Sequence, residues 1–315
     1  MAGKLRAILR LLRVKQYYKN ILIFVGAFFG RMLLDFSLWF ILIFGFILAC
    51  CASSINYVVN DLVDIEKDKA HPEKSKKRPL ASGDLSKSFA YLLLIALISF
   101  IAISIIFIIP YPTNLNFGLM LLVITIIGQS YNFFLKEYAF IDIISLSVIY
   151  VIRAIAGCFL IQVYISPWLI LAIFLVALFL VICKRTADLE LIGEENASKH
   201  KKVYDQYSKK LLEDFHLLVS SSLFITYSLY IILGAFDVGA LETWSYYQYL
   251  SVFTIPLALY LIMRYMYLLK TKPEIARSPV RIFLDKGMIT MGIIIVVILF
   301  ISFYWETMLG LFGLT

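Results

Sequence analysis

Long apolar runs alternate with short polar segments along the whole 315-residue chain. A helix that crosses a bilayer needs about 20 mostly apolar residues. Nine stretches reach or approach that length, at residues 20–34, 36–59, 89–109, 115–135, 139–163, 167–185, 213–235, 247–269 and 287–309. An open sheet could not satisfy its backbone hydrogen bonds in lipid. The pattern therefore predicts an all-α integral membrane protein with nine spans, built as one membrane-embedded domain over residues 1–315.

The composition supports this class of fold. Hydrophobic residues make up 62% of the chain and charged residues only 16%, whereas a soluble domain has roughly 45–50% and about 25%. The four cysteines lie within apolar runs without the spacing of a metal site, and we interpret them as small buried hydrophobic residues. The basic N-terminal segment lacks a small-residue cleavage site, so a removable signal peptide is not expected.

Basic residues gather at one end of the predicted spans. The chain has 29 Lys and Arg against 21 Asp and Glu, a net charge of +8, and all of the basic residues except Arg31 and Arg153 lie on one side. They occur at Lys136 and in segments 1–19, 61–88, 184–210 and 264–286. Because Lys and Arg are enriched in cytoplasmic loops, we expect a cytoplasmic N-terminus, an external C-terminus and charged segments 60–88 and 184–212 that face the cytoplasm of a cell membrane.

The first charged segment opens with a row of carboxylates. Asp61, Asp64 and Asp68 are spaced to fall on one face of a helix that continues the second apolar stretch, and Asn60 precedes them. Like charges on one face repel unless a cation lies among them, and Mg²⁺ prefers carboxylates and substrate phosphates as ligands. We interpret the three aspartates as metal-binding and catalytic residues. The alternative is a solvated helix end.

A basic run follows the carboxylates directly. Residues 74–78 read Lys-Ser-Lys-Lys-Arg, and such cations bind the phosphate oxygens of a metal–diphosphate complex while carboxylates hold the metal. Arg78, between Lys77 and Pro79, is the favoured phosphate ligand. For the individual lysines, simple anchoring at the cytoplasmic surface explains the charge equally well.

The motif Asn60-Asp61-x-x-Asp64-x-x-x-Asp68 at the end of a second membrane helix resembles the UbiA-type intramembrane prenyltransferase superfamily. The resemblance implies a nine-helix bundle with a cytoplasm-facing active-site cavity, in which this motif binds Mg²⁺ and a substrate diphosphate. Segments 16–20 and 70–83 are similar to its decaprenyl-phosphate phosphoribosyltransferase branch. In that reading Asn60, Arg78 and Lys19 bind substrate, with Lys19 adding a cationic contact.

The second charged segment departs from the common pattern of the superfamily. Where an aspartate-rich motif usually follows the sixth helix, this chain has Lys184-Arg185-Thr186-Ala187-Asp188. Two cations with one carboxylate suit a sugar phosphate better than a second metal. The phosphoribosyltransferase branch has a similar pattern with Glu in place of Asp188, which leaves Glu190 as an alternative. Tyr207, in a stretch from His200 to Ser208, also resembles the branch, with a solvated loop as the alternative.

Two further cations belong to the predicted binding site. Arg153 lies midway through the fifth span, where a charge costs at least roughly 2.5–3.5 kcal/mol unless it is paired or faces water. We expect it to point into the bundle toward a lipid phosphate or an internal carboxylate, and the resemblance also implies an Arg here. Lys136 and Asp142 lie near the site by analogy with the family, or else anchor the turn between spans four and five.

The resemblance implies an enzyme that transfers 5-phosphoribose from phosphoribosyl pyrophosphate to a polyprenyl (decaprenyl-type) monophosphate with Mg²⁺, for cell-wall precursor synthesis. One alternative is prenyl transfer from a prenyl diphosphate to an aromatic acceptor, which needs the same first motif. The other is a membrane transporter. Against the transporter, the outer loops are nearly bare of charge and no pair of broken helices occurs at matching mid-span positions. No nucleic-acid partner is expected.

Overall fold

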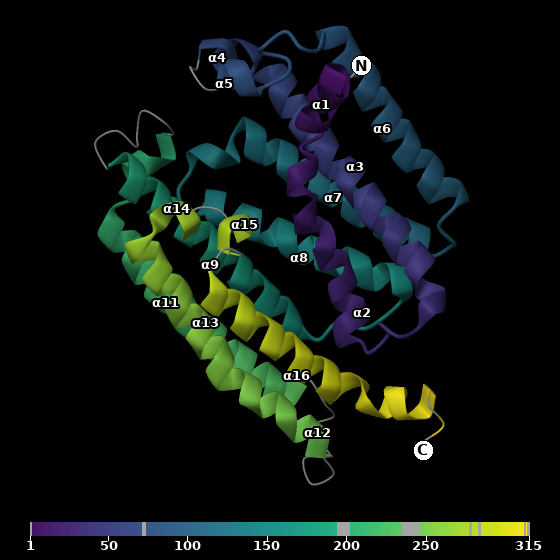
Figure 1. The fold of residues 1–315 in the computed structure, drawn as a ribbon. Helices are drawn as coiled ribbons and strands as arrows, with labels where there is room; N and C mark the ends of the chain where they lie inside the picture. Colours follow the sequence, from purple (N-terminus) through teal and green to yellow (C-terminus); the bar gives the residue numbers. More distant parts are fainter. Residues whose placement is uncertain are drawn as a thin grey trace. The chain divides into compact units, whose positions relative to one another are not determined.

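The computed structural model describes residues 2–70, 74–193, 202–234, 246–276, 279–282, 285–311 and 313, and every regular element within these ranges is a helix (Figure 1). The chain divides into two compact units. The first unit comprises Met1–Phe134 and Ile149–Tyr164, and the second comprises Leu135–Val148 and Ile165–Thr315. Helix α8 (Ile141–Ile161) belongs partly to each.

Eight helical segments of the described chain are long and apolar enough to cross a membrane. They are Phe36–Val63, Lys87–Phe107, Thr113–Phe133, Ile141–Ile161, Pro167–Leu191, Lys209–Leu233, Tyr246–Thr271 and Lys286–Leu311. Each matches one of the predicted spans. The prediction of an all-α membrane protein is therefore confirmed.

The first predicted span, 20–34, is not one continuous α-helix. It begins within a 3₁₀ helix, η1 (Val14–Phe24), which passes directly into a short α-helix, α2 (Val25–Phe29). A 3₁₀ helix rises about 2.0 Å per residue rather than 1.5 Å, so η1 and α2 together extend about 30 Å, near the thickness of the hydrocarbon core. The total of nine spans stays a prediction.

Helix α3 (Trp39–Val63) is the centre of the first unit. It packs against η1, α6 (Lys87–Phe107) and α7 (Thr113–Phe133). At its C-terminal end, α1 (Ala2–Leu11) and the segment after α5 (Lys74–Lys77) join one apolar cluster. The buried members of the cluster are Ala7, Leu11, Val58, Ile65, Leu80, Leu85 and Ala90. This cluster holds the basic segment against the acidic end of α3.

Two glycines let α8 approach η1 and α2 at backbone distance. A Cβ atom at Gly157 would lie 1.9 Å from the Ile23 carbonyl oxygen, and one at Gly26 would lie 2.5 Å from Cys158 Sγ. At Gly157 the atoms in the way belong to the backbone, so glycine is required there, whereas a Cβ at Gly26 would force Cys158 to shift. The crossing lies one helical turn from Arg153 and therefore places that part of α8 beside η1.

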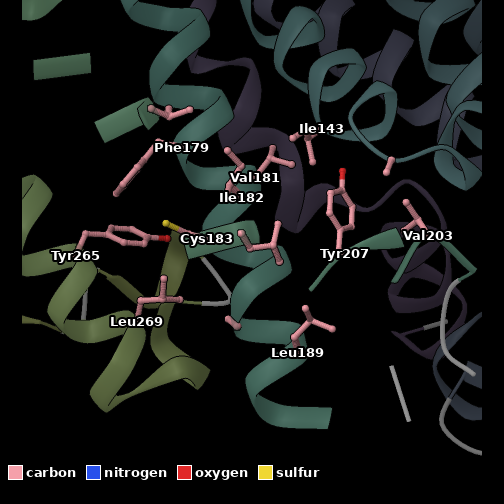
Figure 2. Close-up of a cluster of buried hydrophobic side chains, with 14 of the residues drawn as sticks. Ile143, Phe179, Val181, Ile182, Cys183, Leu189, Val203, Tyr207, Tyr265 and Leu269 are labelled. Carbon is pink, nitrogen blue, oxygen red and sulfur yellow. The ribbon is translucent and has the colours of Figure 1, made fainter. Parts of the chain in front are cut away.

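The second unit is built around α9 (Pro167–Ile192), which packs mainly against α11 (Lys209–Leu229). Helix α13 (Thr254–Thr271) packs against α16 (Lys286–Leu311). Side chains from α9, α11, α13 and η4 (Lys202–Gln206) form the apolar cluster in Figure 2, which includes Phe179, Ile182, Val203 and Tyr265. Helix α9 begins with Pro167 in its first turn and ends at Gly193, whose φ of 81° suits a residue without a side chain.

Short elements complete the described chain. They are η2 (Phe36–Leu38), α4 (Ile65–Ala70), η3 (Leu135–Glu137), the π-helix η5 (Tyr230–Gly234), α12 (Tyr246–Tyr249), η7 (Leu250–Phe253), α14 (Pro273–Ala276) and α15 (Pro279–Ile282).

Candidate active site

The acidic motif lies where α3 gives way to α4. Asp61 is in the last turn of α3, Asp64 is the residue between the two helices, and Asp68 is on α4. Asp61 and Asp68 are both buried and both face Arg78, at N–O distances of 2.7 and 3.9 Å. Asp64 is more exposed and lies 3.8 Å from Lys67. The structure thus places Arg78 between the first and last aspartates of the motif.

Two arginines bind the same oxygen of Asp61. Arg13 Nη2 donates to Asp61 Oδ1 at 2.6 Å, and Arg78 Nη1 donates to that atom at 2.7 Å. The second oxygen, Oδ2, is buried and has no hydrogen-bond partner among the described residues. A buried carboxylate oxygen without a partner fits a hard cation such as Mg²⁺. This fit concerns Asp61, because the described part of the chain contains no cluster of three or more His, Cys, Asp or Glu residues arranged to hold a metal. The three-aspartate ligand set stays a prediction.

Arg13 is a site residue that the sequence analysis missed. Its backbone is left-handed, with φ 52° and ψ 45°, and its guanidinium lies 4.4 Å from the centre of the Tyr57 ring. Burial lowers the pKa of Arg13, while the Asp61 carboxylate raises it. A left-handed conformation costs a non-glycine residue roughly 1–2 kcal/mol. The signal that was available is its place, three residues before the segment 16–20 that resembles the phosphoribosyltransferase branch.

The array of polar groups continues from Arg13 along η1. Tyr57 donates a hydrogen bond to Gln16 Oε1 at 2.9 Å, and Lys19 Nζ donates to the same oxygen at 3.1 Å. Lys19 is half-buried in the first unit, as Asn60 is. The predicted residues Lys19, Asn60, Asp61 and Arg78 therefore all belong to one unit.

Arg153 is a buried cation of this unit. Arg153 is only 7% exposed. No carboxylate of the described chain lies within ion-pair distance of its guanidinium. Its guanidinium lies 5.3 Å from the centre of the Tyr150 ring, and its Nε atom is buried without a hydrogen-bond partner there. The internal carboxylate that the sequence allowed is absent from the described residues, so an anionic ligand is the partner that this cation fits.

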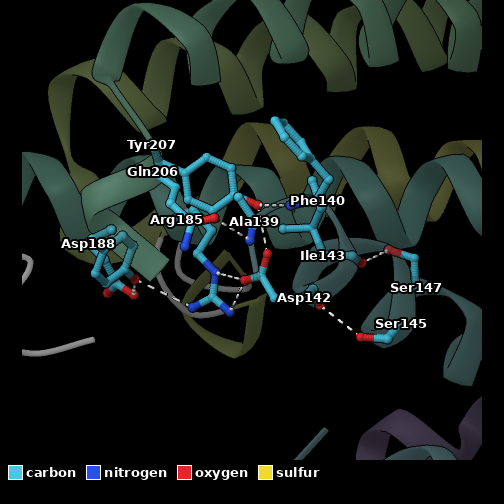
Figure 3. A network of polar contacts seen from close by, with 11 residues as sticks. Ala139, Phe140, Asp142, Ile143, Ser145, Ser147, Arg185, Asp188, Gln206 and Tyr207 are labelled. Atoms are coloured by element: carbon cyan, nitrogen blue, oxygen red, sulfur yellow. Dashed lines mark hydrogen bonds and ion pairs between the residues drawn. The ribbon is translucent and has the colours of Figure 1, made fainter. Parts of the chain in front are cut away.

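The second unit contains a buried polar network around Asp142 (Figure 3). Arg185 Nε donates to Asp142 Oδ2 at 3.0 Å, and Arg185 Nη2 forms an ion pair with the same oxygen at 2.8 Å. Tyr207 donates to Asp142 Oδ1 at 2.6 Å and accepts a bond from the backbone N–H of Phe140 at 2.8 Å. Asp142 and Arg185 are almost completely buried. Each charge is therefore neutralised inside the protein.

Tyr204 extends this network to Asp188. Its hydroxyl donates to Asp188 Oδ2 at 2.6 Å and accepts a bond from Arg185 Nη1 at 3.4 Å. Burial raises the pKa of both Tyr204 and Tyr207 above the usual value, so both hydroxyls are protonated and able to donate at neutral pH. The network ties η4 to α9 and to the start of α8.

These contacts separate residues that the sequence grouped together. Arg185, Asp188 and Tyr207 are buried in contacts with other side chains, whereas Lys184, also on α9, is exposed. Glu190, the alternative carboxylate, pairs with Lys209 at 2.7 Å. Substrate contact by these residues stays a prediction, as it does for the half-buried Lys136. Four residues of the segments that resemble the phosphoribosyltransferase branch lie outside the described residues: His71, Pro72, His200 and Lys201.

We expect Tyr207→Phe to destabilise the protein by about 1.5–3 kcal/mol, because Asp142 would lose a hydrogen bond to a charged group and the Phe140 N–H would lose its acceptor. Thermal unfolding of the purified protein measures this. Tyr138→Phe is the matched control, since Tyr138 is 56% exposed and its hydroxyl makes no hydrogen bond to the described residues. Equal melting temperatures for the two variants would contradict a structural role for Tyr207.

The fold and the first-unit site together define a class of protein: a multi-pass membrane protein whose acidic helix end, flanked by arginines, suits a phosphorylated substrate. The model of the UbiA prenyltransferase family matches residues 21–287. The chain belongs to this family and is a membrane-embedded enzyme of the transferase class. The resemblance noted in the sequence is thereby confirmed.

Curated relatives are named decaprenyl-phosphate phosphoribosyltransferase. The chain is 32% identical over 187 residues to that of Mycolicibacterium smegmatis, which covers 59% of this chain. The match spans 56% of the length of that relative. The chain is 28% identical over 234 residues to the protein of Mycobacterium tuberculosis, covering 73% of this chain and 75% of the relative. The protein of Corynebacterium glutamicum is also 28% identical, over 70% of this chain and 66% of the relative.

Solved structures share the fold. A UbiA homolog from Archaeoglobus fulgidus, bound to GPP and Mg²⁺, matches 94% of this chain and 98% of its own at a TM-score of 0.62 and 19% identity. A structure described as that of digeranylgeranylglyceryl phosphate synthase matches 95% and 98% at a TM-score of 0.59 and 21% identity. At such identities the likeness establishes the UbiA-type fold alone.

Proposed function

We propose that the protein transfers 5-phosphoribose from phosphoribosyl pyrophosphate to a polyprenyl (decaprenyl-type) monophosphate at the cytoplasmic face of the cell membrane. An oxygen of the lipid phosphate attacks the anomeric carbon of the ribose, and the bond from that carbon to the diphosphate oxygen breaks. The products are polyprenyl-phosphoryl-5-phosphoribose and diphosphate. The relatives match 59–73% of this chain, and their names support this choice of substrates.

The observation that carries the proposal is the environment of Asp61. A buried carboxylate has one oxygen bound by Arg13 and Arg78 and a second without a partner in the described chain. Carboxylates that hold a metal beside guanidiniums that bind phosphate are the components of a metal–diphosphate site. Asp61, with Asp64 and Asp68, would hold Mg²⁺, which when bound offsets the charge of the departing diphosphate. Arg13, Arg78 and Lys19 would donate to diphosphate oxygens, with Asn60 beside them.

Arg153 supports an anionic acceptor. It is a buried guanidinium on a membrane-spanning helix with no carboxylate partner in the described chain. A lipid phosphate would supply the missing charge. Because that phosphate is already an anion, it attacks without a general base, and Arg153 only has to bind and orient it.

For the 5-phosphate of the ribose, the sequence indicates Lys184 and Arg185. Since Arg185 is paired with Asp142 in the interior, we assign the phosphate contact to the exposed Lys184, with Lys136 as a second candidate cation. Arg185, Asp188 and Tyr207 would then act by positioning α9 and η4. The segment has Lys184 and Arg185 in place of a second aspartate-rich motif, which favours phosphoribosyl transfer over prenyl transfer to an aromatic ring.

A transfer assay in detergent tests the proposal. It would contain radiolabelled phosphoribosyl pyrophosphate, a polyprenyl monophosphate and Mg²⁺, with Asp64→Asn and EDTA as controls. We expect label in the lipid phase that is lost with either control. If no label moves while a prenyl diphosphate reacts with an aromatic acid, the protein is a prenyltransferase and the choice of soluble substrate is wrong.

A further inference from the structure

Asp61 is bound by two cations at once, and one of them, Arg78, also lies 3.9 Å from Asp68. Both hydrogen bonds end on Oδ1, at 2.6 and 2.7 Å, and the Asp61 side chain is 1% exposed. The two guanidiniums therefore repel each other while sharing one anion.

The two arginines reach Asp61 from separate segments. Arg13 follows α1 and is held in a left-handed conformation against the Tyr57 ring. Arg78 follows α5 and contacts Asp68 as well. Neither belongs to α3, so each can leave Asp61 without unwinding the helix that carries the carboxylate.

We propose that Arg13 and Arg78 make metal binding at Asp61 conditional on diphosphate. This inference rests on the proposed function, since it takes Asp61 to belong to a metal–diphosphate site. A divalent cation that arrives alone meets two guanidiniums already on the carboxylate and adds charge of the same sign. A diphosphate brings several negative charges and binds guanidiniums in bidentate geometry. The arginines then exchange Asp61 for phosphate oxygens, and both carboxylate oxygens become available to the metal.

A purely structural pair predicts something different. If the arginines only hold the end of α3 in place, their removal would weaken metal binding with and without diphosphate. If they compete with the metal, removal of either one strengthens binding of the metal alone and weakens the effect of diphosphate. The two accounts therefore predict opposite changes in the affinity for the metal alone when an arginine is removed.

Equilibrium dialysis of ⁵⁴Mn²⁺ against the full-length protein in detergent measures that sign, because free metal and its soluble diphosphate complex equalise across the membrane. The probes are Mn²⁺ alone and Mn²⁺ with inorganic diphosphate. We expect wild type to bind Mn²⁺ at least about tenfold more tightly with diphosphate, a coupling of about 1.4 kcal/mol. Arg13→Gln and Arg78→Gln should each bind Mn²⁺ alone several-fold more tightly than wild type and lose most of the enhancement.

Arg10→Gln is the matched control, because Arg10 forms an exposed ion pair with Asp84 in the same unit. It should behave as wild type. Melting temperatures show which variants are folded. If either Arg13→Gln or Arg78→Gln does not fold, the other variant still tests the inference. Tight binding with diphosphate in wild type, without tighter binding of Mn²⁺ alone in either variant, would overturn the inference and leave the proposed function standing. Absence of Mn²⁺ binding to wild type under both conditions would overturn both.

Discussion

Asp61→Asn is expected to abolish phosphoribosyl transfer, with a loss of at least about a hundredfold, and to destabilise the protein by about 3–5 kcal/mol. The activity falls because a neutral amide is a poor ligand for the metal and removes the buried oxygen that has no partner. The stability falls because Arg13 and Arg78 are left as half-buried cations without the anion that both bind. The labelled-lipid assay and thermal unfolding measure the two effects separately.

Asp64→Asn separates these effects by position. It makes the same chemical change three residues away, but Asp64 is 19% exposed and lies 3.8 Å from a largely exposed Lys67. We expect it to lose activity with little change in melting temperature. Combining Asp61→Asn with Arg13→Gln should recover part of the stability and none of the activity. Wild-type activity in Asp61→Asn would exclude Asp61 as a metal ligand.

Much of the fold could be predicted because membrane helices leave a strong signal in sequence. Eight of the expected spans have counterparts in the described chain, with ends that differ by a few residues. The first predicted span is the exception: it begins in the 3₁₀ helix η1, which a run of apolar residues does not indicate, and α8 crosses it closely. Gly157 and Gly26 allow that close crossing, but nothing near residues 20–34 indicates that a glycine more than a hundred residues away will meet this segment.

The candidate site shows the same division between local and distant information. The aspartates and Arg78 are close in sequence, so their common position could be inferred from helical spacing and a short loop. Arg13 lies 48 residues from Asp61, and its approach depends on a left-handed turn and on the apolar cluster that holds α1. Neither the left-handed turn nor the apolar cluster could be predicted from the sequence alone.

The second charged segment shows what helical spacing leaves open. Lys184 and Asp188 are four residues apart and were expected to share one face of a helix as part of a ligand set. In the structure Lys184 is exposed, and Asp188 is buried against Tyr204, which comes from η4. Arg185 likewise forms an ion pair with Asp142, at the start of α8. The partners that decide which face is buried come from other segments, so the pattern alone could not separate a ligand from a positioning residue.

Arg153→Met should change stability and activity in opposite directions. Without lipid phosphate present, methionine replaces a buried charge that has no carboxylate partner in the described chain, so we expect the protein to become more stable by about 1–4 kcal/mol. Transfer should fall roughly 10- to 150-fold, which corresponds to charge-assisted hydrogen bonds worth about 1.5–3 kcal/mol. The loss should fall mainly on the KM for polyprenyl phosphate, with the KM for phosphoribosyl pyrophosphate little changed.

Two further variants determine what the charge at this position does. Arg153→Lys retains the charge without the planar donor set, and we expect an intermediate KM for the lipid substrate. Tyr150→Phe keeps the aromatic ring beside the guanidinium and should leave both properties near wild type. A cation kept at a cost in stability is explained by a ligand that it binds. If Arg153→Met instead lowers the melting temperature, the guanidinium is part of the protein's own packing, and the acceptor phosphate must be bound by another cation.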